Sequence, residues 1–403
     1  MSTETTAKPG RRSFLTAATG GLLILKPETV FGTQANSNVE LGLIGCGGRG
    51  NWIGEFFPEY TGARFVAMAD VTRQNLDATG EKFKVDAGRL YYGPDAYQEL
   101  VHSKLDAVVI ETPTYYHPQQ AEAAVAAGKH VYVAKPIAVD VPGALQFLAA
   151  GRKAKGKVSF LVDFQTRARP VYQEAAERIH RGDIGKPALA QVFYYAGRPG
   201  AGVKDMPADP EAARMKAWYR DRVLGGEIIV EQNIHVIDVA NWFLKSHPLK
   251  ASGTGGRTDW TGTNYSDGDA WDHFVVTFWY PETHVTFSSH QLNGSFSDLC
   301  VRVVGVKGTA DTHYGGLIRI TGENKWLGAE QDPTFKEGAV TNVKNFVESI
   351  RTGQLVNNVE PAVESNLTAI LGRMAAYKNG AEVTWKTMLE STERWDARLK
   401  LRY

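Results

Sequence analysis

The sequence has little of three features that would directly indicate a class of protein: it has few cysteines, no large excess of one charge, and no long apolar run. Its two cysteines, Cys46 and Cys300, lie far apart in the chain, so we expect neither a disulfide nor a zinc site. Basic residues number 45 and acidic residues 44, which leaves no strongly basic surface for nucleic acid. The apolar run near the N-terminus is shorter than the roughly 20 residues that span a bilayer. We therefore expect no metal, no nucleic-acid partner and no membrane anchor.

What the chain does have is length and aromatic residues. Its 403 residues are too many for one small core and suit two domains. Aromatic residues make up 10% of the chain, and several of the nine tryptophans fall in loop-like segments. Flat aromatic faces pack against sugar rings, although such side chains also fill cores and interfaces. The composition is therefore compatible with a sugar-like ligand.

The N-terminus has the pattern of an export signal. The stretch RRSFL, residues 11–15, begins a run of small and apolar residues that ends near Leu25. Paired arginines with these flanks resemble the twin-arginine signal, whose export machinery carries folded proteins; the alternative is an ordinary secretory signal. We predict a signal peptide over residues 1–35, cleaved near Ala35, and a periplasmic or otherwise exported protein.

A glycine-rich loop follows the first strand expected after this signal. Residues 39–44 are a short apolar run, and the loop matches G-x-G-x-x-G between that strand and a helix. Gly45 permits the tight turn, Gly47 lets the backbone approach a pyrophosphate, and Gly50 lets the helix pack closely. The helix N-terminus faces the phosphates. The residues assigned to the cofactor in this loop are Gly45, Gly47, Gly48, Arg49 and Gly50.

The next strand, residues 64–69, ends in Asp70. A carboxylate at this position accepts both ribose hydroxyls of NAD and repels the 2′-phosphate of NADP. Arg73 nearby leaves NADP open as an alternative cofactor. Strands and helices then alternate, with strands at 106–111, 130–134 and 158–162 and helices at 118–128 and 141–155. This alternation predicts an α/β domain over residues 36–164, built on a doubly wound parallel sheet.

Two further motifs carry a resemblance. The segments ETPTYYH, residues 111–117, and VYVAKPIAV, residues 131–139, resemble the T-P-x-x-x-H and E-K-P motifs of the Gfo/Idh/MocA family of nicotinamide-dependent sugar and polyol oxidoreductases. The resemblance implies a Rossmann domain and adds cofactor-contacting residues beyond the glycine loop. These are Thr112, Pro113, His117, Ala134 and Lys135.

The resemblance also implies a second domain, residues 165–403, that binds substrate on an α+β framework with an open, mostly antiparallel sheet. The runs 188–196, 272–280, 283–291 and 299–306 are rich in β-branched and aromatic residues, as strands require. In the family, subunits pair through this sheet, so a homo-oligomer is expected.

The candidate catalytic residues lie in a long helical pattern that follows Gly225 and Gly226 and extends to residue 244. Glu231, His235 and Asp238 fall at i, i+4 and i+7, which places them on one stripe of a mostly apolar helix. From the pattern alone, a satisfied structural network is an equal alternative to a functional site. The family resemblance implies an active site of a lysine and a D-x-x-x-H motif, which here corresponds to Lys135, Glu231 and His235.

These three residues suit the oxidation of an alcohol. His235 is the expected base for the hydroxyl proton, Lys135 would hold the substrate oxygen, and Glu231 would orient a partner or a neighbouring hydroxyl. Where the family carries glutamate, this chain has Ala134. The loss of that carboxylate favours a neutral Lys135, which would then share the role of base.

Five residues are candidates for binding the substrate. Gln165 and Arg167 follow the last strand of the first domain, Trp218 and Tyr219 precede the catalytic helix, and Asp238 lies on it. For each of them a structural role is an equal alternative.

An exported dehydrogenase would run out of oxidised cofactor unless it keeps the nucleotide and returns it to its starting state. A second sugar could reoxidise it, as in the family's glucose–fructose and aldose–aldose oxidoreductases, and this is the preferred hypothesis. Alternatively, transient oxidation, elimination of an aglycone, addition of water and reduction would make a glycosidase, as in the family's NAD-dependent N-acetylgalactosaminidases. A non-catalytic sugar-binding protein is the third hypothesis.

Overall fold

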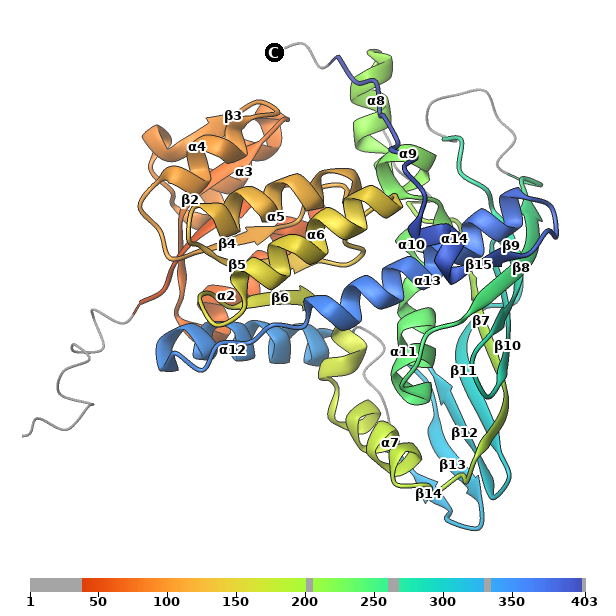
Figure 1. Cartoon of the computed structure of the whole chain (residues 1–403). Helices are drawn as coiled ribbons and strands as arrows, with labels where there is room; N and C mark the ends of the chain where they lie inside the picture. Colours follow the sequence, from red (N-terminus) through yellow and green to blue (C-terminus); the bar gives the residue numbers. More distant parts are fainter. Residues whose placement is uncertain (1–37, 201–205, 260–267, 330–334, 401–403) are drawn as a thin grey trace, which may run out of the picture. The chain divides into compact units, whose positions relative to one another are not determined.

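The computed structural model describes residues 38–200, 206–259, 268–329 and 335–400 (Figure 1). The expected signal peptide lies outside the described residues. Residues 39–403 form one compact unit. Among the helices of the described segments, none is both long enough and apolar enough to cross a membrane.

The first part of this unit is a six-stranded parallel sheet in the order β3-β2-β1-β4-β5-β6. Its central strands are continuous apolar runs that are buried on both faces, as helices on both sides of a parallel sheet require. The prediction of a doubly wound parallel sheet is therefore confirmed. The strands are β1 (Glu40–Ile44), β2 (Arg64–Asp70), β3 (Leu90–Tyr92), β4 (Ala107–Ile110), β5 (His130–Ala134) and β6 (Phe160–Asp163).

Helices from distant parts of the chain cover the two faces of this sheet. Helices α4 (Ala96–His102), α5 (His117–Ala126) and α6 (Val141–Ala154) share one apolar cluster with the sheet. Helix α2 (Gly48–Thr61) covers the other face together with α12 (Lys336–Thr352), whose Phe346 packs against Phe57 and Tyr132. Figure 1 shows α12 alongside α2 and β6, although the sequence placed residues 336–352 in the second domain. Helix α3 (Arg73–Phe83) packs beside β2.

The second part is a nine-stranded sheet in the order β14-β13-β12-β11-β7-β10-β9-β8-β15. Among the described strands of this sheet, only the β7–β10 pair is parallel, so the expected open, mostly antiparallel sheet is confirmed. The strands are β7 (Pro187–Ala196), β8 (Lys250–Gly256), β9 (His273–Trp279), β10 (His284–Gln291), β11 (Asp298–Gly305), β12 (Gly308–His313), β13 (Ile318–Gly322), β14 (Trp326–Leu327) and β15 (Val383–Thr384).

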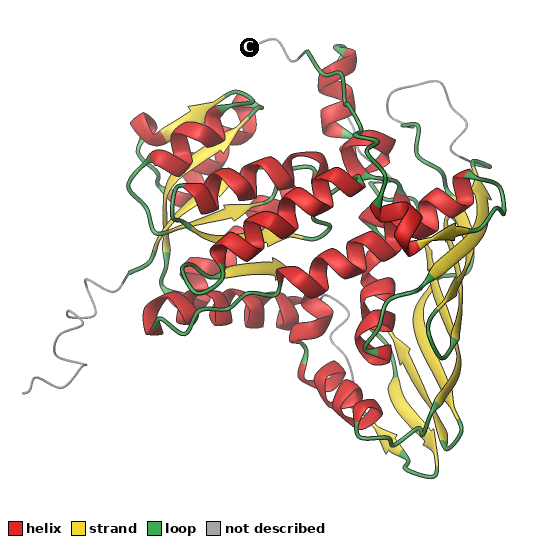
Figure 2. Cartoon of the chain, viewed as in Figure 1, coloured by secondary structure: helices red, strands yellow, loops and turns green. Residues whose placement is uncertain are grey.

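Helices lie against one face of this second sheet (Figure 2). They are α7 (Pro170–His180), α11 (Ile234–Leu244) and α13 (Val359–Tyr377). On the opposite face, Tyr195 stacks between Phe193 and His290 with ring centroids 5.1 and 4.8 Å apart, and Val275 is 53% exposed. Strand register places these four side chains on the same face, because Tyr195 pairs with His290, and Phe193 and Val275 both pair with Ser288, two residues before His290.

The prediction of one continuous helix after Gly226, over residues 227–244, is wrong. Helix α10 (Ile228–Glu231) ends one turn before α11 begins, and Gln232 and Asn233 lie between them. The Asn233 amide donates to the Ile228 carbonyl at 2.9 Å, five residues back rather than four. This extra residue rotates Glu231 away from the stripe that contains His235 and Asp238.

Candidate active site

The glycine loop contains two kinds of glycine. A Cβ at Gly45 would lie 2.7 Å from the Glu111 carbonyl carbon, and one at Gly50 would lie 2.0 Å from the Gly45 carbonyl oxygen. These two positions require glycine for the fold itself. A Cβ at Gly47 or Gly48 would meet no protein atom within 4 Å. The open side of the loop thus lies at the N-terminus of α2, where a pyrophosphate can approach the backbone N–H groups.

Asp70 lies at the end of β2 beside this loop. Its carboxylate accepts hydrogen bonds from the amides of Cys46 and Thr72, both at 2.6 Å. The fixed carboxylate suits the ribose hydroxyls of NAD. Arg73 stacks on Tyr92 at 4.4 Å, close to this strand end. The open loop and the carboxylate fit NAD, which supplies a hydride acceptor when bound.

Arg49, which the sequence assigned to the cofactor loop, extends to two buried acidic side chains. Its Nη2 lies 2.5 Å from Asp163 Oδ2 and its Nε lies 3.4 Å from Glu111 Oε2. Glu111 follows β4 and Asp163 is the last residue of β6, and both strands are buried. Burial raises the pKa of Glu111 to about 8. Asp163 is also held by Asn342, whose Nδ2 donates at 2.8 Å. Neither acid was predicted as a site residue from the sequence, although acidic residues at the carboxyl ends of parallel strands indicate a ligand-binding edge.

His117 joins two loops of the site. Its Nδ1 lies 2.7 Å from the Pro136 carbonyl and its Nε2 lies 2.8 Å from the Thr112 carbonyl. Burial lowers the pKa of His117 to about 4. His117 therefore links the segment of Thr112 and Pro113 to the segment that follows Lys135, while the Thr112 hydroxyl donates to Gln120.

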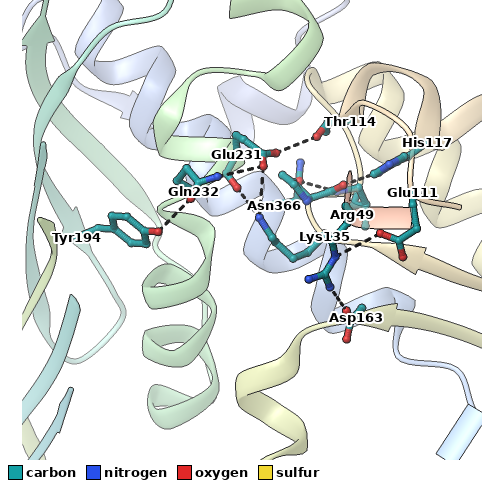
Figure 3. A network of polar contacts seen from close by, with 12 residues as sticks. Arg49, Glu111, Thr114, His117, Lys135, Asp163, Tyr194, Glu231, Gln232 and Asn366 are labelled. Carbon is teal, nitrogen blue, oxygen red and sulfur yellow. Dashed lines mark hydrogen bonds and ion pairs between the residues drawn. The ribbon is translucent and has the colours of Figure 1, made fainter. Parts of the chain in front are cut away.

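Lys135 and Glu231 meet, although they lie 96 residues apart (Figure 3). The Lys135 Nζ donates to the Glu231 carbonyl at 2.6 Å and lies 3.5 Å from Glu231 Oε1. Thr114 donates to Glu231 Oε2 at 3.2 Å, and Gln232 donates to Oε1 at 3.3 Å. Burial lowers the pKa of Lys135, and the charge of Glu231 opposes that shift. Glu231 thus supplies a carboxylate next to Lys135, which is preceded by buried Ala134.

His235 lies at the start of α11 with its ring centroid 5.4 Å from that of Tyr314. Within the described part of the chain its Nδ1 has no hydrogen-bond partner. Burial, together with the charges of Lys135 and Arg49, holds the pKa of His235 well below its usual range. The imidazole is therefore neutral at physiological pH, which leaves a ring nitrogen able to accept a proton.

The candidate substrate-binding residues are placed differently from one another. Arg167 forms a bidentate ion pair with Asp238, and Ser365 also donates to that carboxylate, so Asp238 is fully occupied within the protein. Gln165 is buried, and its Nε2 has no partner among the described residues. Trp218 and Tyr219 form a short 3₁₀ turn ahead of α10.

The sequence analysis also missed Asn233. Its side chain is fully buried at the break between α10 and α11, two residues before His235. Across the described segments, neither its Nδ2 nor its Oδ1 has a hydrogen-bond partner. Asn233 could not be identified from the sequence, because hydrophobic periodicity did not reveal the helix break at which it lies.

The fold and the glycine loop together define an NAD-binding Rossmann protein. Comparison with known proteins is more specific. Residues 39–162 match the Gfo/Idh/MocA oxidoreductase family with its NAD-binding Rossmann fold, and residues 172–311 match the GFO/IDH/MocA C-terminal domain. The chain therefore belongs to the Gfo/Idh/MocA family, and its first domain is that family's NAD-binding domain.

Individual relatives are distant. A scyllo-inositol 2-dehydrogenase (NAD(+)) of Bacillus subtilis is 24% identical over 331 residues, which cover 80% of this chain and 89% of the relative. The structure of aldose-aldose oxidoreductase from Caulobacter crescentus has a TM-score of 0.69 at 20% identity and covers 86% of this chain and 99% of that one. A glycosyl hydrolase family 109 protein of Shewanella amazonensis is 38% identical over 111 residues, 26% of this chain and 24% of the relative.

Proposed function

We propose that the protein is an exported NAD-dependent oxidoreductase that oxidises a secondary or anomeric hydroxyl of a sugar or polyol. The observation that carries this proposal is the meeting of Lys135 and Glu231 near a neutral His235, in a domain built to hold NAD. The relatives named above include an inositol dehydrogenase and an aldose-aldose oxidoreductase, which supports this substrate class.

In this mechanism each residue has one task. Lys135 donates a hydrogen bond to the substrate oxygen and stabilises the negative charge that develops on it. His235 accepts the hydroxyl proton at Nδ1, which has no hydrogen-bond partner among the described residues. The lowered pKa makes this imidazole a weak base, so the transfer depends on Lys135 to stabilise the alkoxide. Glu231 holds the Lys135 ammonium and accepts a neighbouring hydroxyl. Bound NAD would supply the acceptor for the hydride from the carbon that bears this hydroxyl.

We further propose that NAD is loaded before export and stays bound, so that a second sugar must reoxidise it. The twin-arginine pattern in residues 11–15 supports this, because that route carries folded proteins. We also propose that a second copy of the chain covers the aromatic face around Tyr195. That face leaves large apolar side chains in contact with water.

The second candidate is an NAD-dependent glycosidase. The match to the glycosyl hydrolase family 109 protein favours it, because that relative is 38% identical to this chain, although over only 111 residues. Lys135 and His235 would then have the same roles, but the oxidation of one ring carbon would be transient and would be reversed later in the reaction.

One experiment separates the two candidates. The protein is purified without added nucleotide, and reduced-nicotinamide fluorescence is followed after addition of myo-inositol, D-glucose or D-galactose, and then of aryl glycosides. A lasting rise that a second sugar reverses supports the two-substrate oxidoreductase, whereas aglycone release without lasting reduction supports the glycosidase. A Lys135→Met variant should lose either signal and still bind NADH. If wild type with added NAD gives neither signal, the proposal is wrong.

A further inference from the structure

The segment that follows Lys135 has no regular secondary structure, yet other elements hold every residue of it. Each of residues 136–140 takes part in a hydrogen bond to a distant part of the chain. The partners are His117 for Pro136, Asn366 for Ile137 and Ala138, Arg373 for Val139, and the Trp395 amide for Asp140. An irregular segment fixed this completely is held in one conformation rather than in an ensemble.

Arg373 of α13 connects this segment to the one that carries Glu231. Its Nη1 donates to the Val139 carbonyl at 2.7 Å and to the Gly226 carbonyl at 3.0 Å. The residue is only 3% exposed. One buried nitrogen therefore holds the loop after Lys135 and the loop before Glu231 at a fixed separation.

Glu227, the next residue after Gly226, shows that this region is under strain. Its φ of 78° and ψ of 160° lie in a region that glycine adopts almost alone. Its buried carboxylate accepts hydrogen bonds from the Trp271 amide at 2.7 Å and from the Tyr377 hydroxyl. Such a conformation persists only where the surroundings impose it. Arg373 and Tyr377 are one helical turn apart on α13, so one face of this helix imposes the conformation together with the Trp271 amide.

The C-terminal tail covers this arrangement. The ring of Trp395 lies 3.8 Å from the Arg373 guanidinium carbon, and its amide donates to Asp140 at 2.7 Å. Arg214 of α8 (Pro210–Lys216) donates to the Ala397 carbonyl at 2.9 Å, which fixes the tail further along. The tail thus shields the guanidinium from water and strengthens its hydrogen bonds.

We infer that Arg373 is a positioning residue, which fixes Lys135 against Glu231 by holding the loops on which both depend. Arg373 touches neither side chain of the pair and acts only through the backbone of residues 139 and 226. The inference rests on the proposed function, because it assumes that Lys135 and Glu231 perform the chemistry.

The test compares Arg373→Met and Arg373→Lys with Arg152→Met, the same change at an exposed arginine of α6. Four quantities are measured. NADH affinity is measured by fluorescence, and kcat and KM are measured with whichever of myo-inositol, D-glucose and D-galactose reduces NAD fastest. The pKa of Lys135 is measured by competitive acetic anhydride labelling and mass spectrometry. For Arg373→Met we expect kcat to fall roughly 10- to 100-fold, since displacement of reacting groups by about 1 Å has effects of this size. NADH affinity should stay within about twofold, because the glycine loop is untouched.

The pKa of Lys135 should rise toward its ordinary value in Arg373→Met, because a loosened loop admits water to the ammonium. Arg373→Lys keeps the charge but not the planar guanidinium, so it should be intermediate in both quantities, and Arg152→Met should match wild type. A folded Arg373→Met with the kcat and Lys135 pKa of wild type would overturn the inference. If Arg373→Met does not fold, Arg373→Lys decides by the same criteria. If wild type is inactive, the proposed function fails, while the labelling still tests the positioning role.

Discussion

Replacing Glu111 by glutamine should change how the stability of the protein depends on pH. Burial raises the pKa of Glu111 from 4.5 to about 8, even though Arg49 opposes the shift. Between these two values the unfolded chain ionises this carboxyl while the folded protein keeps it protonated. The folded state therefore loses stability as pH rises from 4.5 to 8. Linkage gives a loss of roughly 3 kcal/mol between pH 5 and pH 8 from this group.

The assay is urea unfolding of nucleotide-free protein at pH 5, 6.5 and 8. Wild type should lose roughly 3 kcal/mol more than Glu111→Gln over this range, because the amide cannot ionise. Glu227, whose pKa burial raises to about 7, is present in both proteins, so its contribution cancels in the difference. Glu122→Gln, at a partly exposed glutamate of α5, is the matched control and should follow wild type. If Glu111→Gln and wild type depend on pH equally, Glu111 is not a buried, protonated acid and the reasoning is refuted.

Two further predictions concern the cofactor loop. Gly47→Ser should leave the free energy of unfolding unchanged, because a Cβ there meets no protein atom and serine caps a helix well, yet it should weaken NADH binding at least about tenfold. Gly50→Ser should instead lower the free energy of unfolding by at least roughly 1–3 kcal/mol, because its Cβ would overlap the Gly45 carbonyl oxygen. Urea unfolding and NADH titration of both variants test this, and equal stabilities would contradict it. Asp70→Ser removes the carboxylate that repels a 2′-phosphate, so the ratio of NADP to NAD affinity should rise at least about tenfold. Titration with both nucleotides measures that ratio, and an unchanged ratio would exclude Asp70 from ribose recognition.

The parallel sheet was predictable because its signals are local. The strand from 40 to 44, the glycine loop and Asp70 each depend on residues that are close in sequence. The strands of the second sheet were likewise visible as β-branched runs, and two of them, β9 and β10, pair antiparallel as neighbours along the chain. Their order in the sheet was not predictable, because β7 pairs with β10 and β11, which lie about 100 residues away along the chain.

The site was only partly predictable. Lys135, Glu231 and His235 were identified through motifs, and the structure brings Lys135 and Glu231 together. Periodicity assumed an unbroken helix and therefore missed the break at Asn233. It also gave no indication that Arg167 and Asp238 would satisfy each other. Such pairing depends on which helices meet in three dimensions, and no spacing within one helix encodes it.

The position of α12 has a consequence for how the chain is made. This helix completes the apolar cluster under the nucleotide-binding sheet with Val343, Phe346 and Val347, which are synthesised about 180 residues after β6. During translation the glycine loop therefore emerges long before the sheet that supports it can close on that face. A ribosome-bound chain that ends before residue 336 would expose Phe57 and Tyr132 and would rely on chaperones. The nucleotide site can therefore mature only after α12 has been synthesised, and any later step that needs a folded nucleotide-binding domain must wait for that helix.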